Sequence, residues 1–197
     1  MKPLRIGLTG GLASGKSTVA KLLTSAGFAV IDADALVAEL YEPAGLGTKA
    51  VAGIFGAKIL DPRGGVDKPQ LARLIFNDDK TRARVESAIH PLVRSLFQFR
   101  AQEKSGPVVL EATRLIEAGF GADFDLILTV EAAPELRLER AVARGMSRDE
   151  AIRRLAAQGD GAERRKAAWR VLTNNGSPAE LRAAVSAIVA EIHELTE

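Results

Sequence analysis

The residues that most directly indicate chemistry are Gly10-Gly-Leu-Ala-Ser-Gly-Lys-Ser17, which match the pattern G-x-x-x-x-G-K-[ST] without a gap. Gly10 and Gly15 allow backbone turns that a Cβ atom would forbid, so that successive N–H groups can point at one anion. Lys16 adds a mobile positive charge, and Ser17 adds a hydroxyl suited to Mg²⁺. This stretch predicts a loop that holds phosphate groups.

The segments on either side provide the elements that such a loop needs, a buried strand before it and a helix after it. Residues 4–9 are apolar enough for a short buried strand, and residues 16–26 carry apolar side chains at helical spacing until Gly27. Phosphates in the loop would then lie at a helix N-terminus, where the helix dipole favours negative charge. A glycine turn with an accidental lysine is the alternative, and it leaves the strand and the helix unexplained.

A second apolar strand, residues 28–31, is followed by Asp32-Ala-Asp34. Ligands of parallel α/β sheets bind beyond the carboxyl ends of the strands, so acids here are expected at the same edge as the phosphate loop. Asp34 is favoured as the reactive carboxylate and Asp32 as a cap or loop residue. Asp34 also fits as the cap of a helix that begins at Ala35, since Asp is common at helix N-termini.

The next strand begins only near residue 107, and the apolar spacing of residues 35–104 is helical. This stretch is too long for a plain crossover between strands, so we expect an inserted subdomain that binds a substrate. His90-Pro91 breaks its last part, and Pro91 is expected to open a helix that runs to about Lys104. A lone histidine such as His90 more often has a structural than a catalytic role.

Three further strands are predicted at residues 107–111, 125–130 and 169–173. Glu111 ends the first of them, where an acid can support Mg²⁺, although an acid after an apolar strand is common. Asn174-Asn-Gly176 follows the last strand on the nucleotide side of the sheet, where amide groups can contact a base.

Arginines are concentrated between residues 137 and 170. Arg140 and Arg144 share one face of a helix that begins at Pro134. Such a pair is usually solvated charge, but beside a phosphate loop it can stabilise a transferring phosphoryl group. Glycines flank the basic segment 146–167, which predicts a mobile lid.

The composition limits the remaining possibilities. A chain of 197 residues, 47% of them hydrophobic, suits one compact α/β domain with a small insertion. There are no cysteines, which excludes disulfides, thiolate metal sites and thiol nucleophiles. The N-terminus has no signal-peptide pattern and no apolar run reaches membrane-spanning length, so a cytoplasmic protein without a membrane partner is expected. The net charge of +2 argues against a nucleic-acid partner.

Over nearly its full length the chain resembles the dephospho-coenzyme A kinase family. The shared features are the phosphate loop, Val30-Ile-Asp-Ala-Asp34, Glu42-Pro43, Phe55-Gly56, His90-Pro91, Leu115 with Glu117, Arg140, Gln158 and Asn175-Gly176. The phosphate loop alone occurs in many families, whereas this combination is specific. The resemblance implies a P-loop NTPase-type, three-layer α/β fold, in which a five-stranded parallel sheet carries a helical insertion and a small lid. It also implies that ATP, with Mg²⁺, phosphorylates the ribose 3′-hydroxyl of dephospho-coenzyme A (dephospho-CoA), the last step of coenzyme A synthesis.

The resemblance further implies roles for segments and single residues. The nucleotide-binding core would comprise residues 1–34, 105–145 and 168–197, the acceptor subdomain residues 35–104, and the lid residues 146–167. The catalytic residues would be Lys16, Asp34, which accepts the proton of the hydroxyl or orients it, and Arg140, with Ser17 holding Mg²⁺. ATP would contact Gly11, Leu12, Ala13, Ser14, Gly15, Lys16, Ser17, Thr18, Arg144, Asn175 and Gly176. The acceptor would contact Thr9, Asp34, His90, Leu115 and Glu117.

Four departures from the family pattern keep two alternatives open. Thr113-Arg-Leu115 stands where the family usually has Pro-Leu-Leu, Lys68 and Ala38 stand where it has arginine, and Ala168-Trp169 replaces Ala-Asp. These positions are expected near the acceptor pocket or the lid rather than near the phosphate loop. The alternatives are a kinase for another small-molecule or nucleotide acceptor and a nucleotide-binding protein without turnover. A GTPase is not favoured, because no Asn-Lys-x-Asp element for reading guanine is present.

Overall fold

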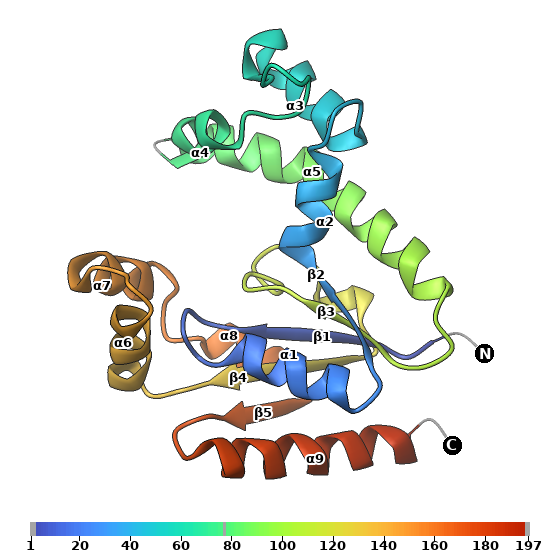
Figure 1. Ribbon diagram of the computed structural model, residues 1–197, viewed down its shortest axis with the longest axis vertical. Coiled ribbons are helices and arrows are strands. Elements are labelled where there is room, and N and C mark those ends of the chain that lie inside the picture. The colour runs from blue at the N-terminus through green and yellow to red at the C-terminus, as the bar shows by residue number, and fades with distance from the viewer. Residues whose placement is uncertain (1–2, 77, 196–197) are drawn as a thin grey trace. The chain divides into compact units, whose positions relative to one another are not determined.

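The computed structural model describes residues 3–76 and 78–195. Strands and helices follow one another along the chain, with short 3-10 turns at Ala57–Ile59 and Gly121–Asp123. In order they are β1 (Arg5–Gly10), α1 (Lys16–Ser25), β2 (Ala29–Asp32), α2 (Ala33–Leu40), α3 (Leu46–Phe55), α4 (Lys68–Phe76), α5 (Asp79–Gln102), β3 (Val108–Glu111), β4 (Leu126–Glu131), α6 (Pro134–Ala143), α7 (Arg148–Ala157), α8 (Ala162–Ala167), β5 (Arg170–Thr173) and α9 (Pro178–Glu194) (Figure 1).

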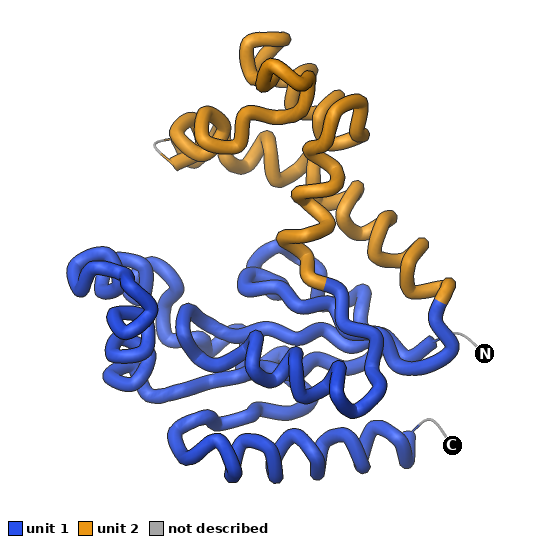
Figure 2. The backbone as a smooth tube through the Cα atoms, in the orientation of Figure 1, with its two compact units in different colours: residues 1–31, 104–197 blue, residues 32–103 orange. Residues whose placement is uncertain are grey.

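These elements form two compact units, residues 1–31 with 104–197 and residues 32–103, which we call the sheet unit and the helical unit (Figure 2). One compact domain with an insertion at 35–104 was expected from the sequence. The boundaries of the helical unit, 31/32 and 103/104, lie close to those of the expected insertion, and within this unit α2, α3 and α4 each pack on α5. The division into core, acceptor subdomain and lid stays a prediction. No helix within the described residues is long and apolar enough to cross a membrane. The cytoplasmic location stays a prediction.

The sheet has five strands in the order β2-β3-β1-β4-β5. β1 pairs in parallel with β3 and with β4, and β4 pairs in parallel with β5. The α/β fold with a five-stranded sheet, which the sequence predicts, is therefore confirmed. Since β1 lies between β3 and β4, the loop that follows β1 starts from the middle of the sheet.

The two faces of the sheet are covered by different parts of the sheet unit. Ile6 and Leu8 on β1 belong to one core with apolar side chains of α1 and α9. Gly7 points to the opposite face, because successive residues of a strand alternate in direction. A Cβ atom on Gly7 would lie 3.0 Å from Leu115 and from Phe124, so the segment after β3 covers this second face closely.

The prediction that Pro91 opens a helix is wrong. α5 runs for 24 residues from Asp79 with Pro91 inside it, and its N-cap is Asp78, whose side chain accepts hydrogen bonds from Lys80 N and Thr81 N. Proline removes one backbone donor from a helix interior. The apolar stripe on both sides of Pro91 is buried and compensates for that loss. Its members are Val85, Ile89, Val93 and Phe97.

Candidate functional site

The phosphate loop connects β1 directly to α1. Gly15 is the N-cap of α1 and has a left-handed conformation with φ 104°. A Cβ atom there would lie 2.1 Å from Asn174 Nδ2, so only glycine fits. Val19 N donates to Gly15 O, which places the first turn of α1 immediately after the loop. The unpaired N–H groups of that turn are the donors that an anion at a helix N-terminus uses.

Glu111 holds the two loop side chains that the sequence assigns to phosphate and metal. Its Oε1 accepts from Lys16 Nζ at 2.6 Å and from Ser17 Oγ at 2.8 Å. The side chains of Lys16 and Glu111 are only 15% and 11% exposed. The acid at the end of β3 thus lies in contact with the loop, and it orients both groups.

The donor set at this point suits Mg²⁺. Ser17 offers a hydroxyl and Glu111 a carboxylate, and oxygen ligands are what Mg²⁺ prefers. No cluster of three or more metal-ligating His, Cys, Asp or Glu residues occurs in the described part of the chain. Mg²⁺ is usually held by one or two protein oxygens together with substrate phosphates and water.

The two predicted phosphate-binding arginines of α6 differ in their surroundings. Arg140 has a buried Nη1 atom without a hydrogen-bond partner among residues 3–76 and 78–195. Arg144 is exposed at the C-terminal end of the same helix. A buried guanidinium nitrogen without a partner is costly, and an anionic ligand would satisfy it. Arg140 is therefore the arginine better suited to a phosphate.

Arg137 and Gln158, which have no predicted role, form hydrogen bonds with the backbone of Leu12 in the phosphate loop. Gln158 Oε1 accepts from Leu12 N at 2.7 Å and from Arg137 Nη2 at 2.9 Å, and Arg137 Nε donates to Leu12 O at 2.9 Å. Burial and the nearby charge of Arg164 lower the pKa of Arg137, and Glu131 opposes them. Nothing local in the sequence marks the two contacts with Leu12, because each joins residues more than a hundred positions apart.

Arg164 on α8 lies in a second buried group of charges. Its side chain is 2% exposed and pairs with Glu117 at 3.1 Å and with Glu131 at 3.4 Å. Thr129 Oγ1 also donates to Glu131 Oε1, at 2.8 Å. Part of the segment 146–167, predicted as a lid, is thereby fixed to the end of β4. Glu117, which the resemblance assigns to the acceptor, is already engaged in one of these pairs.

The asparagines after β5 have different contacts. Asn174 Nδ2 donates to Ser14 O at 2.8 Å, so this buried side chain supports the phosphate loop. Asn175 Oδ1 accepts from Ala133 N at 2.8 Å, at the start of α6. Gly176 is exposed, and a Cβ atom on it would lie 2.1 Å from Glu180 Oε2. The sequence predicts Asn174 only as part of a stretch whose amide groups can contact a base, and its support of the phosphate loop was missed.

The other two predicted acceptor residues of the sheet unit are buried. Thr9 is inaccessible to solvent and its Oγ1 donates to Thr113 O at 3.1 Å. Leu115 is likewise buried, against Gly7. Contact of either residue with an acceptor stays a prediction.

In the helical unit Asp32 is the N-cap of α2, and its side chain accepts from Asp34 N at 2.8 Å. The prediction that Asp32 is the cap is confirmed. Asp34 instead lines a pocket of about 340 Å³ together with Lys68. The rest of this pocket wall is apolar or aromatic, from Val37, Ala38, Tyr41, Leu71, Ala72 and Ile75. His90 lies half-buried on α5, outside the wall of this pocket.

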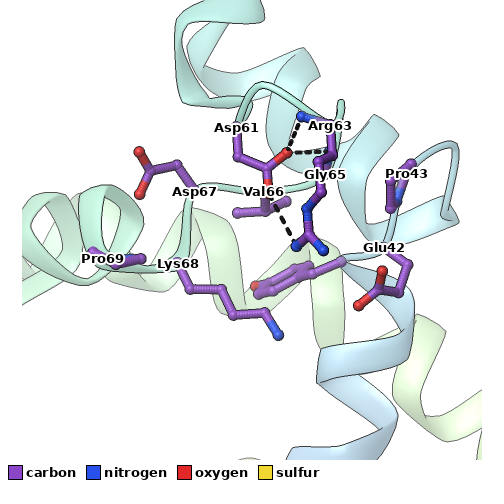
Figure 3. Close-up of a pocket in the computed structure, with 10 residues that line it drawn as sticks. Glu42, Pro43, Asp61, Arg63, Gly65, Val66, Asp67, Lys68 and Pro69 are labelled. Atoms are coloured by element: carbon purple, nitrogen blue, oxygen red, sulfur yellow. Dashed lines mark hydrogen bonds and ion pairs between the residues drawn. The ribbon is translucent and has the colours of Figure 1, made fainter.

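A second pocket of about 340 Å³ shares Tyr41 and Lys68 with the first. Figure 3 shows the cationic ends of Arg63 and Lys68 on the same side of this pocket as the carboxylate of Glu42. Arg63 also pairs with Asp61 at 3.5 Å. The two pockets together provide an apolar wall that ends in Asp34 and a polar part with two cations.

Comparisons with known proteins show which family the chain is similar to. A family model described as dephospho-CoA kinase matches residues 4–180. The dephospho-CoA kinase of Geobacter sulfurreducens is 42% identical over 191 residues, which cover 94% of this chain and 97% of that protein. That of Moorella thermoacetica is 40% identical, with 95% and 91% covered. Among solved structures, TT1252 from Thermus thermophilus is 38% identical with a TM-score of 0.83, over 98% of this chain and 99% of that one. A shikimate kinase from Bacteroides thetaiotaomicron, 14% identical with a TM-score of 0.52 over 96% and 98%, shares the fold alone.

Proposed function

The chain belongs to the dephospho-CoA kinase family, and from this premise we propose that it transfers the γ-phosphoryl group of ATP to the ribose 3′-hydroxyl of dephospho-CoA. This is the last step of coenzyme A biosynthesis. The observation that carries the proposal is the complete phosphate loop, with Lys16 and Ser17 held by Glu111 at 2.6 Å and 2.8 Å. The family match then selects the acceptor among the many that phosphate-loop kinases use.

On the donor side, the N–H groups at the start of α1 and the charge of Lys16 would bind the ATP phosphates. Lys16 would exchange its contact with Glu111 for one with the nucleotide. Arg140, with its buried unpartnered Nη1, would balance charge on the transferring group. Ser17 and Glu111 would hold Mg²⁺, which would neutralise phosphate charge when bound. Arg144, Asn175 and Gly176 complete the proposed ATP contacts.

On the acceptor side, Asp34 would orient the 3′-hydroxyl and take its proton. The apolar wall beside Asp34 suits a flat ring such as adenine, and the cations Lys68 and Arg63 suit the diphosphate group of dephospho-CoA. The proposed acceptor contacts of Thr9, His90, Leu115 and Glu117 and the closure of residues 146–167 belong to the same hypothesis. A long acceptor can use binding energy from its remote parts to align the hydroxyl.

The test is a choice of acceptors. Purified protein with Mg-ATP should phosphorylate dephospho-CoA in preference to AMP, UMP, shikimate and adenosine, as measured by coupled ADP release and mass spectrometry of the product. Preference for another acceptor would replace the proposal by a different kinase. ATP binding without transfer to any of them would indicate a nucleotide-binding protein without turnover.

A substitution of Lys68 tests whether the helical unit binds the diphosphate group of the acceptor. Lys68→Met should lower kcat/KM for dephospho-CoA by about tenfold, since a charge-assisted contact with the diphosphate is lost. The same variant should leave kcat/KM for adenosine, which has no phosphate, nearly unchanged. Lys49→Met, an exposed lysine of α3, is the matched control. Equal losses for both acceptors would show that Lys68 does not bind the diphosphate.

A further inference from the structure

We propose that Arg137 and Gln158 are positioning residues, which hold the phosphate loop in its nucleotide-binding conformation through the backbone of Leu12. We call the contacts among these three residues the Leu12 clasp. The inference rests on the proposed function only in requiring that the loop binds nucleotide phosphates. It assigns a role to two side chains that the reaction itself does not use.

The clasp is closed and partly buried. Three hydrogen bonds of 2.7 to 2.9 Å connect Leu12 N, Leu12 O, Gln158 Oε1 and the Arg137 guanidinium. Arg137 is 5% exposed, whereas Leu12 and Gln158 are half-buried. Both backbone polar groups of Leu12 therefore have side-chain partners, at a point where neither strand nor helix provides them.

The next residue shows why the loop needs this support. Ala13 has φ 56°, in the left-handed region that is unfavourable for a residue with a Cβ atom. Such a conformation persists only where the surroundings determine it. Ala13 is 7% exposed and packs against Ala141 of α6 and Ala151 of α7, beside the clasp. α6, which carries Arg137, and α7, which Gln158 caps, thus also enclose the left-handed backbone of Ala13.

Gly11 is a second, independent sign that the clasp is built into the loop. The pattern G-x-x-x-x-G-K-S leaves this position open. Here a Cβ atom on residue 11 would lie 2.3 Å from Arg137 Nη2. A side chain at this position would displace the Arg137 guanidinium, so glycine at residue 11 is what allows the clasp to form.

Loss of the clasp would let the loop relax at Ala13, so that the N–H groups that follow would no longer converge on one phosphate. Gln158 is the C-cap of α7, so the clasp also connects the proposed lid to the loop. The apparent nucleotide affinity is then the affinity of the binding conformation multiplied by the fraction of molecules whose loop is in that conformation. The fold of the sheet unit does not depend on that fraction.

The experiment measures ADP binding by calorimetry in the full chain. Arg137→Met and Gln158→Leu should each weaken ADP binding by about tenfold or more, since charge-assisted and buried bonds are lost. Gln158→Glu, which keeps an acceptor for both bonds, should restore most of the affinity. Arg182→Met, an exposed arginine of α9 in the same unit, is the matched control for the loss of charge. In turnover the KM for ATP should rise while the KM for dephospho-CoA stays within about twofold.

A substitution at the strained position separates positioning from simple stability. Ala13→Gly removes the penalty of the left-handed conformation, so in the Arg137→Met background it should recover at least a few-fold of the lost ADP affinity. In the wild-type background, where the loop is already held, the gain in affinity should be smaller than in the Arg137→Met background. Equal effects in the two backgrounds, or wild-type ADP affinity in both Arg137→Met and Gln158→Leu, would overturn the clasp. Wild-type protein that does not bind ADP would overturn the proposed function instead.

Discussion

The phosphate loop of the sheet unit and the turn and cap acids Asp61 and Asp78 of the helical unit make polar contacts of opposite kinds. At the phosphate loop, buried side chains join distant parts of the chain, as Arg137 does with Leu12 and Asn174 does with Ser14. In the helical unit, Asp61 accepts from backbone N–H groups at most four residues away, and so does Asp78. These local bonds are mostly exposed, and they shape turns and caps rather than connect elements.

The difference indicates what each unit contributes to the proposed reaction. Groups aimed at developing charge are most effective when they are fixed in advance and shielded from water. The sheet unit provides that on the phosphate side. The helical unit provides apolar walls and accessible cations, which suit recognition of a long acceptor. Substitutions in the sheet unit should therefore act on phosphate chemistry, and those in the helical unit on the acceptor.

The largest effect is expected for Lys16→Ala. It should lower kcat by about 10³-fold, because Lys16 acts in a partly dehydrated site where electrostatic stabilisation is strongest. Thermal melting should stay close to wild type, and Lys21→Ala, an exposed lysine of α1, is the control for the loss of a charge. Near-normal turnover at saturating ATP would mean that the loop is not the catalytic phosphate site.

Asp34→Asn should come next, with kcat reduced by about 10²-fold and the KM for ATP changed by less than about twofold. The reason is that, in the proposed reaction, its carboxylate would orient the acceptor hydroxyl and take its proton late in a loose transition state. Asp32→Asn should be milder, since asparagine caps a helix about as well as aspartate. If Asp34→Asn lowered ATP affinity as strongly as kcat, substitutions in the helical unit would not act on the acceptor alone, and the contrast with the sheet unit would be wrong.

A smaller effect is expected in the proposed lid. When ATP and the acceptor are both bound, amide hydrogen exchange in residues 146–157 should slow several-fold, because lid closure excludes water. Residues 162–167 should change less, since the buried pairs of Arg164 already hold α8 to β4. Mass spectrometry of peptides from the two segments measures this. Identical responses in both would show that Arg164 does not fix α8.

The smallest effect concerns Tyr41, the one tyrosine of the sequence. Burial raises the pKa of Tyr41 from 10.0 to about 12. Because the folded pKa is the higher one, the stability that neutral Tyr41 contributes is complete below about pH 10 and is lost as the pH rises towards about 12. Ultraviolet titration of the phenol should give a midpoint near 12 in the folded protein and near 10 in urea. A folded midpoint near 10 would mean that the pocket wall is open to water.

What the sequence could predict was local. The loop motif, the five apolar strands and the Asp32 cap each depend on residues close in sequence, and all three are present in the structure. Pro91 was predicted wrongly because packing along α5 outweighs the missing donor. The partners of the loop, Gln158 and Asn174, are single polar residues without a repeating pattern. Only the folded arrangement brings them to Leu12 and Ser14.

β1 lies between β3 and β4, and both of these strands are translated after residue 107. During synthesis on the ribosome, β1 with Ile6 and Leu8 therefore has no partner strand until the whole helical unit has been translated. Such distant pairing makes folding slow and leaves apolar strands exposed to aggregation, which is the condition that chaperones relieve. Arg137, Gln158 and Asn174, which hold the phosphate loop, emerge later still. The support of this loop is thus completed only late in synthesis.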